Sequence, residues 1–217
     1  MGYHQAGFEV VGVDNRPQPR YPFEFHQADA LEYLATADLT WFDAIHASPP
    51  CQDHSPLRSV AGTHGTGWLL EATRTALKAT GLPYVIENVE AAAMPGSLVL
   101  CGTEFGLRSG NRWLRRHRRF ASNVFLLGAG GCQCNRPTSP TGVYGDLSLN
   151  DRPVRHSKRG DVMNRAGVAT ARTLLGCPWM NAAELSQAIP PAYTRFIGEQ
   201  LADHIRATPP TKELSTR

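Results

Sequence analysis

Two short segments of this sequence carry the residue types that attack an aromatic base. Residues 49–52 read Pro-Pro-Cys-Gln, and residues 87–89 read Glu-Asn-Val. A thiolate that adds to carbon 6 of cytosine, with a carboxylic acid at N3, activates carbon 5 toward electrophiles. Cys51 is the candidate thiolate, because the two prolines before it restrict the backbone and aim the side chain. Glu87 is the candidate acid at N3, and Asn88 would fix the loop that carries it.

The target base would have to leave the double helix to reach these groups. A cytosine paired inside a duplex is inaccessible to a thiolate, so it must be flipped out of the stack. Arg116 and Arg118 could then hold the flipped nucleotide or its phosphate, because guanidinium groups bind phosphate through paired hydrogen bonds.

The pattern around both segments predicts an α/β fold whose strand ends converge. Strands alternate with helices, which argues for a mostly parallel sheet with its ligands beyond the carboxyl ends of the strands. The expected strands cover residues 9–14, 25–29, 42–47 and 84–86, and the expected helices cover residues 2–7, 30–34 and 68–80. Asp14, Asp29, Cys51 and Glu87 all lie at such strand ends.

The pattern loosens after Val99, and the chain divides into four predicted parts. An outer strand is expected at 119–127, an extended basic loop at 128–160 and an amphipathic helix at 191–205. The four parts are a catalytic domain (1–125), a short basic DNA-recognition region (126–171), a C-terminal segment returning to the catalytic domain (172–207) and a tail (208–217).

Composition bounds the class of protein. The 217 residues are 41% hydrophobic and 19% charged, which suits one soluble globular domain with a sizeable core. No apolar run approaches the roughly 20 residues that cross a bilayer, and the first residues do not resemble a signal peptide. The five scattered cysteines are then expected to be reduced thiols. We therefore predict a cytoplasmic, monomeric protein without membrane contact.

The charges are distributed unevenly. Residues 1–105 hold 5 basic and 12 acidic side chains, whereas residues 106–172 hold 13 basic and 3 acidic ones. A basic block of this size is the footprint expected for a polyanion such as DNA. The alternative, a solvated charged surface, usually spreads both signs more evenly.

Both chemical segments resemble those of the cytosine-5 DNA methyltransferase family of bacterial or phage type. In that family the Pro-Cys-Gln cysteine is the nucleophile and the Glu-Asn-Val glutamate contacts N3. The Arg-His-Arg at 116–118 resembles the family's Arg-x-Arg segment, and residues 188–193 resemble the segment that closes its cofactor pocket. Residues 7–14 resemble its second strand, whose acid binds the ribose of S-adenosylmethionine, and Asp29 falls where the family places an acid near the adenine amine.

The resemblance implies a Rossmann-like methyltransferase fold, S-adenosylmethionine as cofactor and double-stranded DNA as partner. It also implies a role in DNA methylation, either as a host-evasion methylase or within a restriction-modification system. No metal site is predicted. The predicted site residues are catalytic Cys51, Glu87 and Arg118, cofactor-binding Asp14, Asp29 and Pro49, and DNA-binding Gln52, Ser55, Asn88 and Arg116.

This sequence departs from the family pattern at its start. The family begins with a strand and a glycine-rich loop of the type Asp-x-Phe-x-Gly-x-Gly, which cradles the methionine end of the cofactor. No such segment precedes Gly7 here, so we expect an N-terminal truncation and a gap between the strands that end at Asp14 and Ala47. Leu114 also replaces a usual Gln, His54 replaces a usual aromatic residue, and the recognition region is short.

Three other interpretations are open. The first is a non-catalytic DNA-binding remnant of the family, which would bind duplex DNA but not S-adenosylmethionine. The second is an amino-methyltransferase, because Ser48-Pro49-Pro50 resembles part of the Ser-Pro-Pro-aromatic loop of those enzymes, although Cys51 stands where the aromatic ring belongs. The third is a zinc site at Cys132-x-Cys134 with His156, a weak signal without a second cysteine pair.

Overall fold

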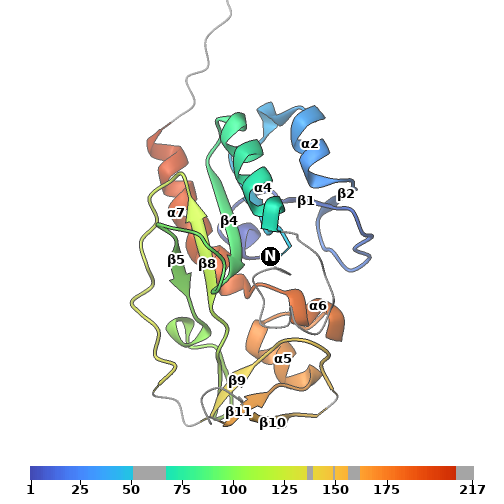
Figure 1. The fold of residues 1–217 in the computed structure, drawn as a ribbon, viewed down its shortest axis with the longest axis vertical. Coiled ribbons are helices and arrows are strands. Elements are labelled where there is room, and N and C mark those ends of the chain that lie inside the picture. Colours follow the sequence, from blue (N-terminus) through green and yellow to red (C-terminus); the bar gives the residue numbers. More distant parts are fainter. Residues whose placement is uncertain (51–66, 136–138, 149, 156–161, 209–217) are drawn as a thin grey trace, which may run out of the picture.

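The computed structural model describes residues 1–50, 67–135, 139–148, 150–155 and 162–208. Within these residues the fold is mixed α/β, with six α-helices and three sheets of two, four and five strands (Figure 1). An α/β class was predicted, and the division into several sheets was not. In the same part of the chain, no helix combines the length and apolar character that a membrane crossing requires.

The four-stranded sheet forms the centre of the molecule. Its order is β3 (Ile45–Ala47), β4 (Tyr84–Val89), β8 (Arg118–Ser122) and β5 (Leu98–Leu100). β3 and β4 run parallel, whereas β8 is antiparallel to both β4 and β5. The sheet is therefore mixed rather than mostly parallel. The strand expected at the outer edge is β8, which instead lies between two others.

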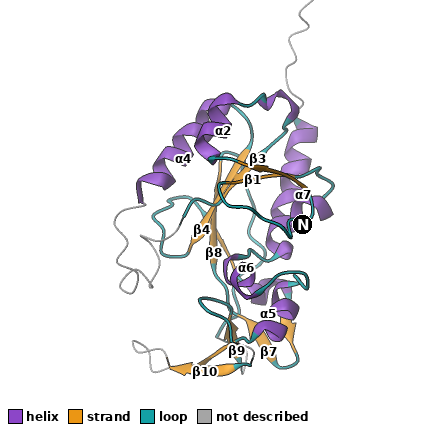
Figure 2. Cartoon of the chain, turned by 90° about the vertical axis from the view of Figure 1, so that its right-hand side faces the viewer, coloured by secondary structure: helices purple, strands orange, loops and turns teal. Residues whose placement is uncertain are grey.

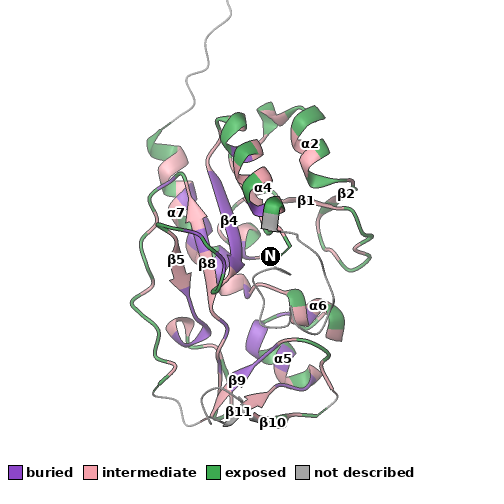
Figure 3. Ribbon diagram, in the orientation of Figure 1, coloured by how far each residue is buried: buried purple, intermediate pink, exposed green. Residues whose placement is uncertain are grey.

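β4 is buried on both faces of this sheet (Figure 3). Because successive side chains of a strand point to opposite faces, Val85 packs into one apolar cluster while Tyr84 and Ile86 pack into another. Figure 2 shows α4 (Gly67–Thr80) on one side of the sheet and α7 (Pro191–Ala207) on the other. Both helices match the amphipathic helices predicted at these positions.

A separate pair of parallel strands carries the first acidic strand end. It consists of β1 (Val11–Asp14) and β2 (Glu24–Gln27), and α2 (Ala30–Thr36) follows β2. Among the described residues no strand pairing joins β1 to β3. Both strands instead line a cavity of about 460 Å³. The sheet is interrupted at the place where the sequence led us to expect a gap.

The two ends of the described chain pack together. α1 (Gly2–Gln5) lies against α7. The approach is close, because a Cβ atom at Gly198 would lie 2.9 Å from the side chains of Tyr3 and Ala6, and one at Gly2 would overlap Thr194. Glycine is needed at both positions for the helices to meet at this distance.

The five-stranded sheet lies at the other end of the molecule (Figure 1). Two helices, α5 (Val168–Leu175) and α6 (Ala182–Gln187), cover it, and the core between them and the sheet includes Leu114, Leu174 and Leu185. The strands are β10 (Arg152–Arg155), β11 (Val162–Arg165), β9 (Pro140–Gly142), β7 (Arg112–Leu114) and β6 (Arg108–Ser109), in sheet order. The region predicted as loop-rich thus contributes three strands. It also pairs with β7, which precedes the predicted domain boundary at residue 125.

Candidate functional site

The segments that carry the predicted chemistry meet at the carboxyl ends of β3 and β4. Ala47 is paired with Ile86 in parallel register, so the residues that follow them lie side by side. The amide Nδ2 of Asn88 donates a hydrogen bond to the carbonyl oxygen of Pro49, at 3.2 Å. The Ser48 side chain hydrogen-bonds to that of Glu87. The Pro-Pro and Glu-Asn segments are therefore in contact.

Glu87 is a buried carboxyl group with a cationic partner. Its residue is only 6% exposed, and Oε1 lies 3.0 Å from Nε of Arg118. Burial raises the pKa of Glu87, while the charge of Arg118 and the hydrogen bond from Ser48 act against that rise. A carboxyl group whose pKa is raised can donate a proton or a hydrogen bond at a ring nitrogen.

Asn88 fixes the backbone on both sides of this contact. It is 1% exposed, and its Oδ1 accepts a hydrogen bond from the amide of Val89 at 2.9 Å. The same side chain therefore holds the end of β4 and the turn after β3. Glu87 itself lies within β4 and not on the loop expected from the sequence, because β4 continues to Val89 and pairs there with β8. Direct contact of Asn88 with DNA stays a prediction.

The two arginines of the Arg-His-Arg segment occupy different environments. Arg118 faces Glu87, and its catalytic role stays a prediction. Arg116 is only 4% exposed, and its guanidinium donates to the carbonyls of Val143 and Ser186. The DNA contact predicted for Arg116 stays a prediction, and this placement argues instead for a structural role that joins the two sheets.

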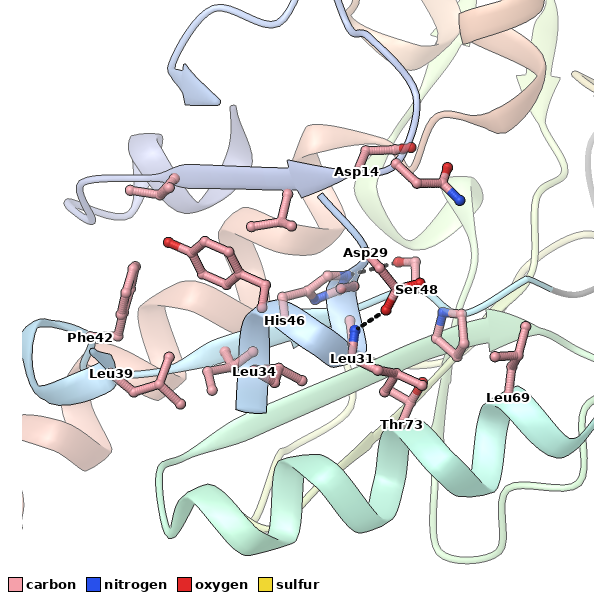
Figure 4. Close-up of a pocket in the computed structure, with 18 of the residues that line it drawn as sticks. Asp14, Asp29, Leu31, Leu34, Leu39, Phe42, His46, Ser48, Leu69 and Thr73 are labelled. Carbon is pink, nitrogen blue, oxygen red and sulfur yellow. Dashed lines mark hydrogen bonds between the residues drawn. The ribbon is translucent and has the colours of Figure 1, made fainter. Parts of the chain in front are cut away.

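The three residues predicted to bind cofactor line one cavity. Asp14, Asp29 and Pro49 surround a space of about 410 Å³ between β1, α2 and β3 (Figure 4). Its volume lies within the range of ~300–1,000 Å³ typical of small-molecule sites. Leu31 and Phe42 contribute apolar surface to the same wall. A cavity lined by carboxylates and by apolar side chains suits a nucleoside. The hydroxyls of the sugar can donate hydrogen bonds to the carboxylates, and the base can pack against the apolar side chains.

Both carboxylates also have local roles. Asp29 caps α2, with Oδ1 accepting from the amides of Leu31 and Glu32 at 2.9 and 3.1 Å. Asp14 accepts from the amide of Arg16 at 2.8 Å and from Gln18 at 3.2 Å. A helix cap alone would explain an acid at Asp29. Its position on the cavity wall is the additional observation that a cofactor role needs.

His46 is a site residue that the sequence analysis did not single out. Its Nδ1 lies 2.8 Å from the hydroxyl of Tyr3, and its Nε2 lies 3.1 Å from Oγ of Ser48. Because Ser48 also bonds to Glu87, the four side chains form a continuous chain of hydrogen bonds. Burial lowers the pKa of His46 to about 4. A histidine inside an otherwise apolar strand was the signal available in the sequence.

Three predicted site residues lie outside the described residues. They are Cys51, Gln52 and Ser55. The described chain reaches Pro50, which lines the same cavity as Pro49.

The basic segment is only partly available to a polyanion. Several of its arginines are used within the protein: Arg112 pairs with Asp151 at 3.2 Å, and Arg119 donates to the carbonyl of Glu90 at 2.6 Å. Arg152 on β10 is exposed. Among the described residues of this segment, several arginines therefore support the fold, while Arg152 lies at the surface.

No family model matches this chain, and no curated protein matches it significantly. The two motif segments nevertheless lie next to each other in the fold. That geometry brings Pro49 to Asn88 and holds Glu87 beside Arg118.

Proposed function

We propose that this chain is a DNA (cytosine-5-)-methyltransferase that acts through a covalent adduct of Cys51 with a flipped cytosine. The observation that carries the proposal is the hydrogen bond from Asn88 to Pro49. It joins the turn that leads to the cysteine with the strand end that bears Glu87. A buried carboxyl group with a raised pKa beside that turn is what activation of a pyrimidine ring requires.

Each residue has a defined task in this reaction. The thiolate of Cys51 forms a bond to carbon 6 of the base, and the π electrons of the C5–C6 bond become available at carbon 5. Glu87 donates to N3 and so stabilises the electron-rich ring, while Arg118 holds the carboxyl group in place. After methylation a water molecule takes the proton on carbon 5, the electrons of that C–H bond re-form the C5–C6 double bond, and Cys51 leaves as a thiolate while the proton at N3 returns to Glu87.

The cofactor cavity fits the adenosine part of S-adenosylmethionine. The carboxylate of Asp14 is suited to accept hydrogen bonds from the ribose hydroxyls, and that of Asp29 from the adenine amine. Pro49 is suited to pack against the cofactor on the side of the cavity that leads to Cys51. When bound, the cofactor supplies the methyl group. The described residues that line this cavity include no glycine, so nothing among them resembles a glycine-rich cradle for the methionine part.

In this proposal the protein is a cytoplasmic monomer that binds double-stranded DNA. Gln52 and Ser55 follow the nucleophile and are proposed to contact the DNA around the flipped base. The exposed Arg152 offers a phosphate contact, which would position the protein without reading sequence.

A duplex carrying 2-pyrimidinone at the target position tests the nucleophile by itself. This base lacks the exocyclic amine and accepts thiols readily, so its adduct does not depend on methyl transfer. We expect a complex that survives denaturing electrophoresis, disappears in Cys51→Ala and persists in Cys177→Ala. Loss of the complex in both variants, or its absence from the unaltered chain, would contradict the proposal.

The alternative is a DNA-binding protein of the same ancestry without methyl transfer. Two observations on the described residues favour it: the lining of the cavity includes no glycine, and no strand pairing joins β1 to β3. Titration calorimetry separates the two: the enzyme should bind S-adenosylmethionine at micromolar concentration, whereas the alternative should bind duplex DNA with strong salt dependence and no cofactor.

A further inference from the structure

Four side chains outside the proposed active site converge on one point. They are Cys101, His117, Cys132 and Cys134, and their ligand atoms all lie within 4.8 Å of one another. Three separate segments supply them. Cys101 follows β5, His117 lies between β7 and β8, and the two other cysteines belong to the loop after β8. A convergence of thiols and an imidazole from three segments requires an explanation beyond local sequence.

The individual distances are those of a ligand shell. Sγ of Cys101 lies 3.1 Å from Sγ of Cys134, and Nε2 of His117 lies 3.2 Å from Sγ of Cys132 and 3.6 Å from Sγ of Cys134. At a Zn–S distance of ~2.3 Å, a regular tetrahedron places its ligand atoms roughly 3.3–3.8 Å apart. The cluster therefore needs only a small expansion to enclose an ion.

A disulfide does not explain the cluster. All four described cysteines are free thiols. The separation of 3.1 Å between the sulfurs of Cys101 and Cys134 is well beyond a covalent S–S bond of about 2.05 Å.

The surroundings orient the ligands. Nδ1 of His117 lies 3.1 Å from Oε2 of Glu90, which leaves Nε2 facing the sulfurs. Carboxylate–histidine pairs of this kind fix the ring in metal sites. The Thr103 hydroxyl lies 3.5 Å from Sγ of Cys101, and the amide of Cys134 donates to Sγ of Cys132 at 3.3 Å. Such polar contacts stabilise thiolates.

We infer that Cys101, His117, Cys132 and Cys134 form a structural zinc site. Three thiolates and one imidazole are a common closed zinc shell, and this soft donor set disfavours magnesium and calcium. Cys101 is fully buried while Cys132 is exposed, so the ion would enter from the side of the loop. All four positions are filled by protein, which marks a structural rather than a catalytic ion.

The site would stiffen the segment that serves the proposed active site. His117 lies between Arg116, which joins the two sheets, and Arg118, which faces Glu87. Its partner Glu90 directly follows β4. A bound ion would thus tie the loop after β8 and the end of β5 to the backbone on which Arg118 is carried.

Metal content of the purified full chain tests this inference. Protein that is produced in zinc-supplemented medium and then desalted should contain about one zinc ion per chain, as measured by inductively coupled plasma mass spectrometry. Cys134→Ser should lose most of it, whereas His117→Cys should retain it, because four cysteines also bind zinc. The matched control is Cys177→Ala, because the thiol of Cys177 is buried in the apolar cluster beside α5 and α6 and does not belong to the proposed zinc site. This variant should leave the zinc content unchanged.

The unaltered chain decides the question even if a variant fails to fold. Cobalt in place of zinc should give the visible absorption of tetrahedral thiolate coordination. Substoichiometric zinc with every thiol reactive toward a disulfide reagent would overturn the inference. So would a Cys101–Cys134 disulfide in the freshly purified protein, or iron in place of zinc.

Discussion

The Asn88 side chain donates a hydrogen bond to the carbonyl oxygen of Pro49 across 39 positions of sequence. This contact ties the turn after β3 to the end of β4, and it depends on the parallel pairing of those strands. The reaction proposed for Cys51 and Glu87 requires these two strand ends to lie close together.

Removing the amide of Asn88 should loosen this junction. In Asn88→Ala the Pro49 carbonyl and the Val89 amide both lose a partner in a partly buried setting, so the free energy of unfolding should fall by about 1–3 kcal/mol. Asn88→Asp should keep the acceptor for Val89 and lose the donor to Pro49. Denaturant titration of both variants measures the two contacts separately. Equal stability of Asn88→Ala and the unaltered protein would show that the contact is unimportant.

Breaking the ion pair between Glu87 and Arg118 should lower the free energy of unfolding more than breaking an ion pair at the surface. Arg118→Ala leaves a buried carboxylate without its cation, which should lower the free energy of unfolding by about 3 kcal/mol. The matched control is Arg206→Ala, because Arg206 and Asp203 form an exposed pair on α7 whose loss should cost less than about 1 kcal/mol. Similar effects in the two variants would contradict the buried pairing.

Two variants separate the helix-cap role of Asp29 from a cofactor role. Asn caps helices about as well as Asp, so Asp29→Asn should leave stability unchanged while weakening binding of S-adenosylmethionine. Asp29→Ala should lower both stability, by about 1 kcal/mol, and binding. Thermal unfolding and calorimetric titration supply the two readouts. Unchanged cofactor affinity in Asp29→Asn would leave the capping role alone.

Replacement of Arg116 should affect stability, whereas replacement of Arg152 should affect DNA binding. Arg116→Ala removes a buried guanidinium from the carbonyls of Val143 and Ser186, so stability should fall by about 3 kcal/mol. Arg152→Ala should leave stability unchanged, weaken duplex binding and reduce its salt dependence by about one counterion. Binding measured at several salt concentrations, beside denaturation curves, tests both. A stable Arg116→Ala variant with weakened DNA binding would restore the DNA contact predicted from the sequence.

The lowered pKa of His46 predicts acid sensitivity. The ring titrates near 6.5 when the chain is unfolded and at about 4 when it is folded. Between these values the unfolded chain binds more protons, so stability is complete above pH 6.5 and declines as the pH falls toward 4. His46→Gln should remove this decline. The measurement is the difference in unfolding free energy between the two proteins at each pH, which cancels the titration of other groups; a constant difference would exclude the effect.

The sequence was most informative where strands and helices are long or strongly patterned. α4 and α7 have clear amphipathic patterns and lie where they were predicted. The carboxyl ends of β3 and β4 converge because parallel strands place their ends at one edge, so the meeting of Pro49 with Asn88 could be anticipated from pattern alone.

The sequence was least informative about pairing between distant short strands. β8 begins with two arginines and was expected at the edge, yet Arg118 pairs with Glu87 while Arg119 bonds to Glu90 and Ser97. Polar partners such as these allow a strand with charged residues to lie inside the sheet. Because the partners come from distant parts of the chain, the local sequence pattern does not reveal them. The cysteine cluster is similar, because spacing drew attention to His156, which lies outside the described residues, while Cys101 is remote in sequence.

The packing of α1 on α7 has a consequence for synthesis on the ribosome. The residues of α1 are made long before those of their partner helix α7, which carries the close contacts at Gly198. Chains grow at ~5–20 residues per second, so α1 would spend many seconds without its packing surface. The contact between α1 and α7 therefore forms only after α7 has left the exit tunnel.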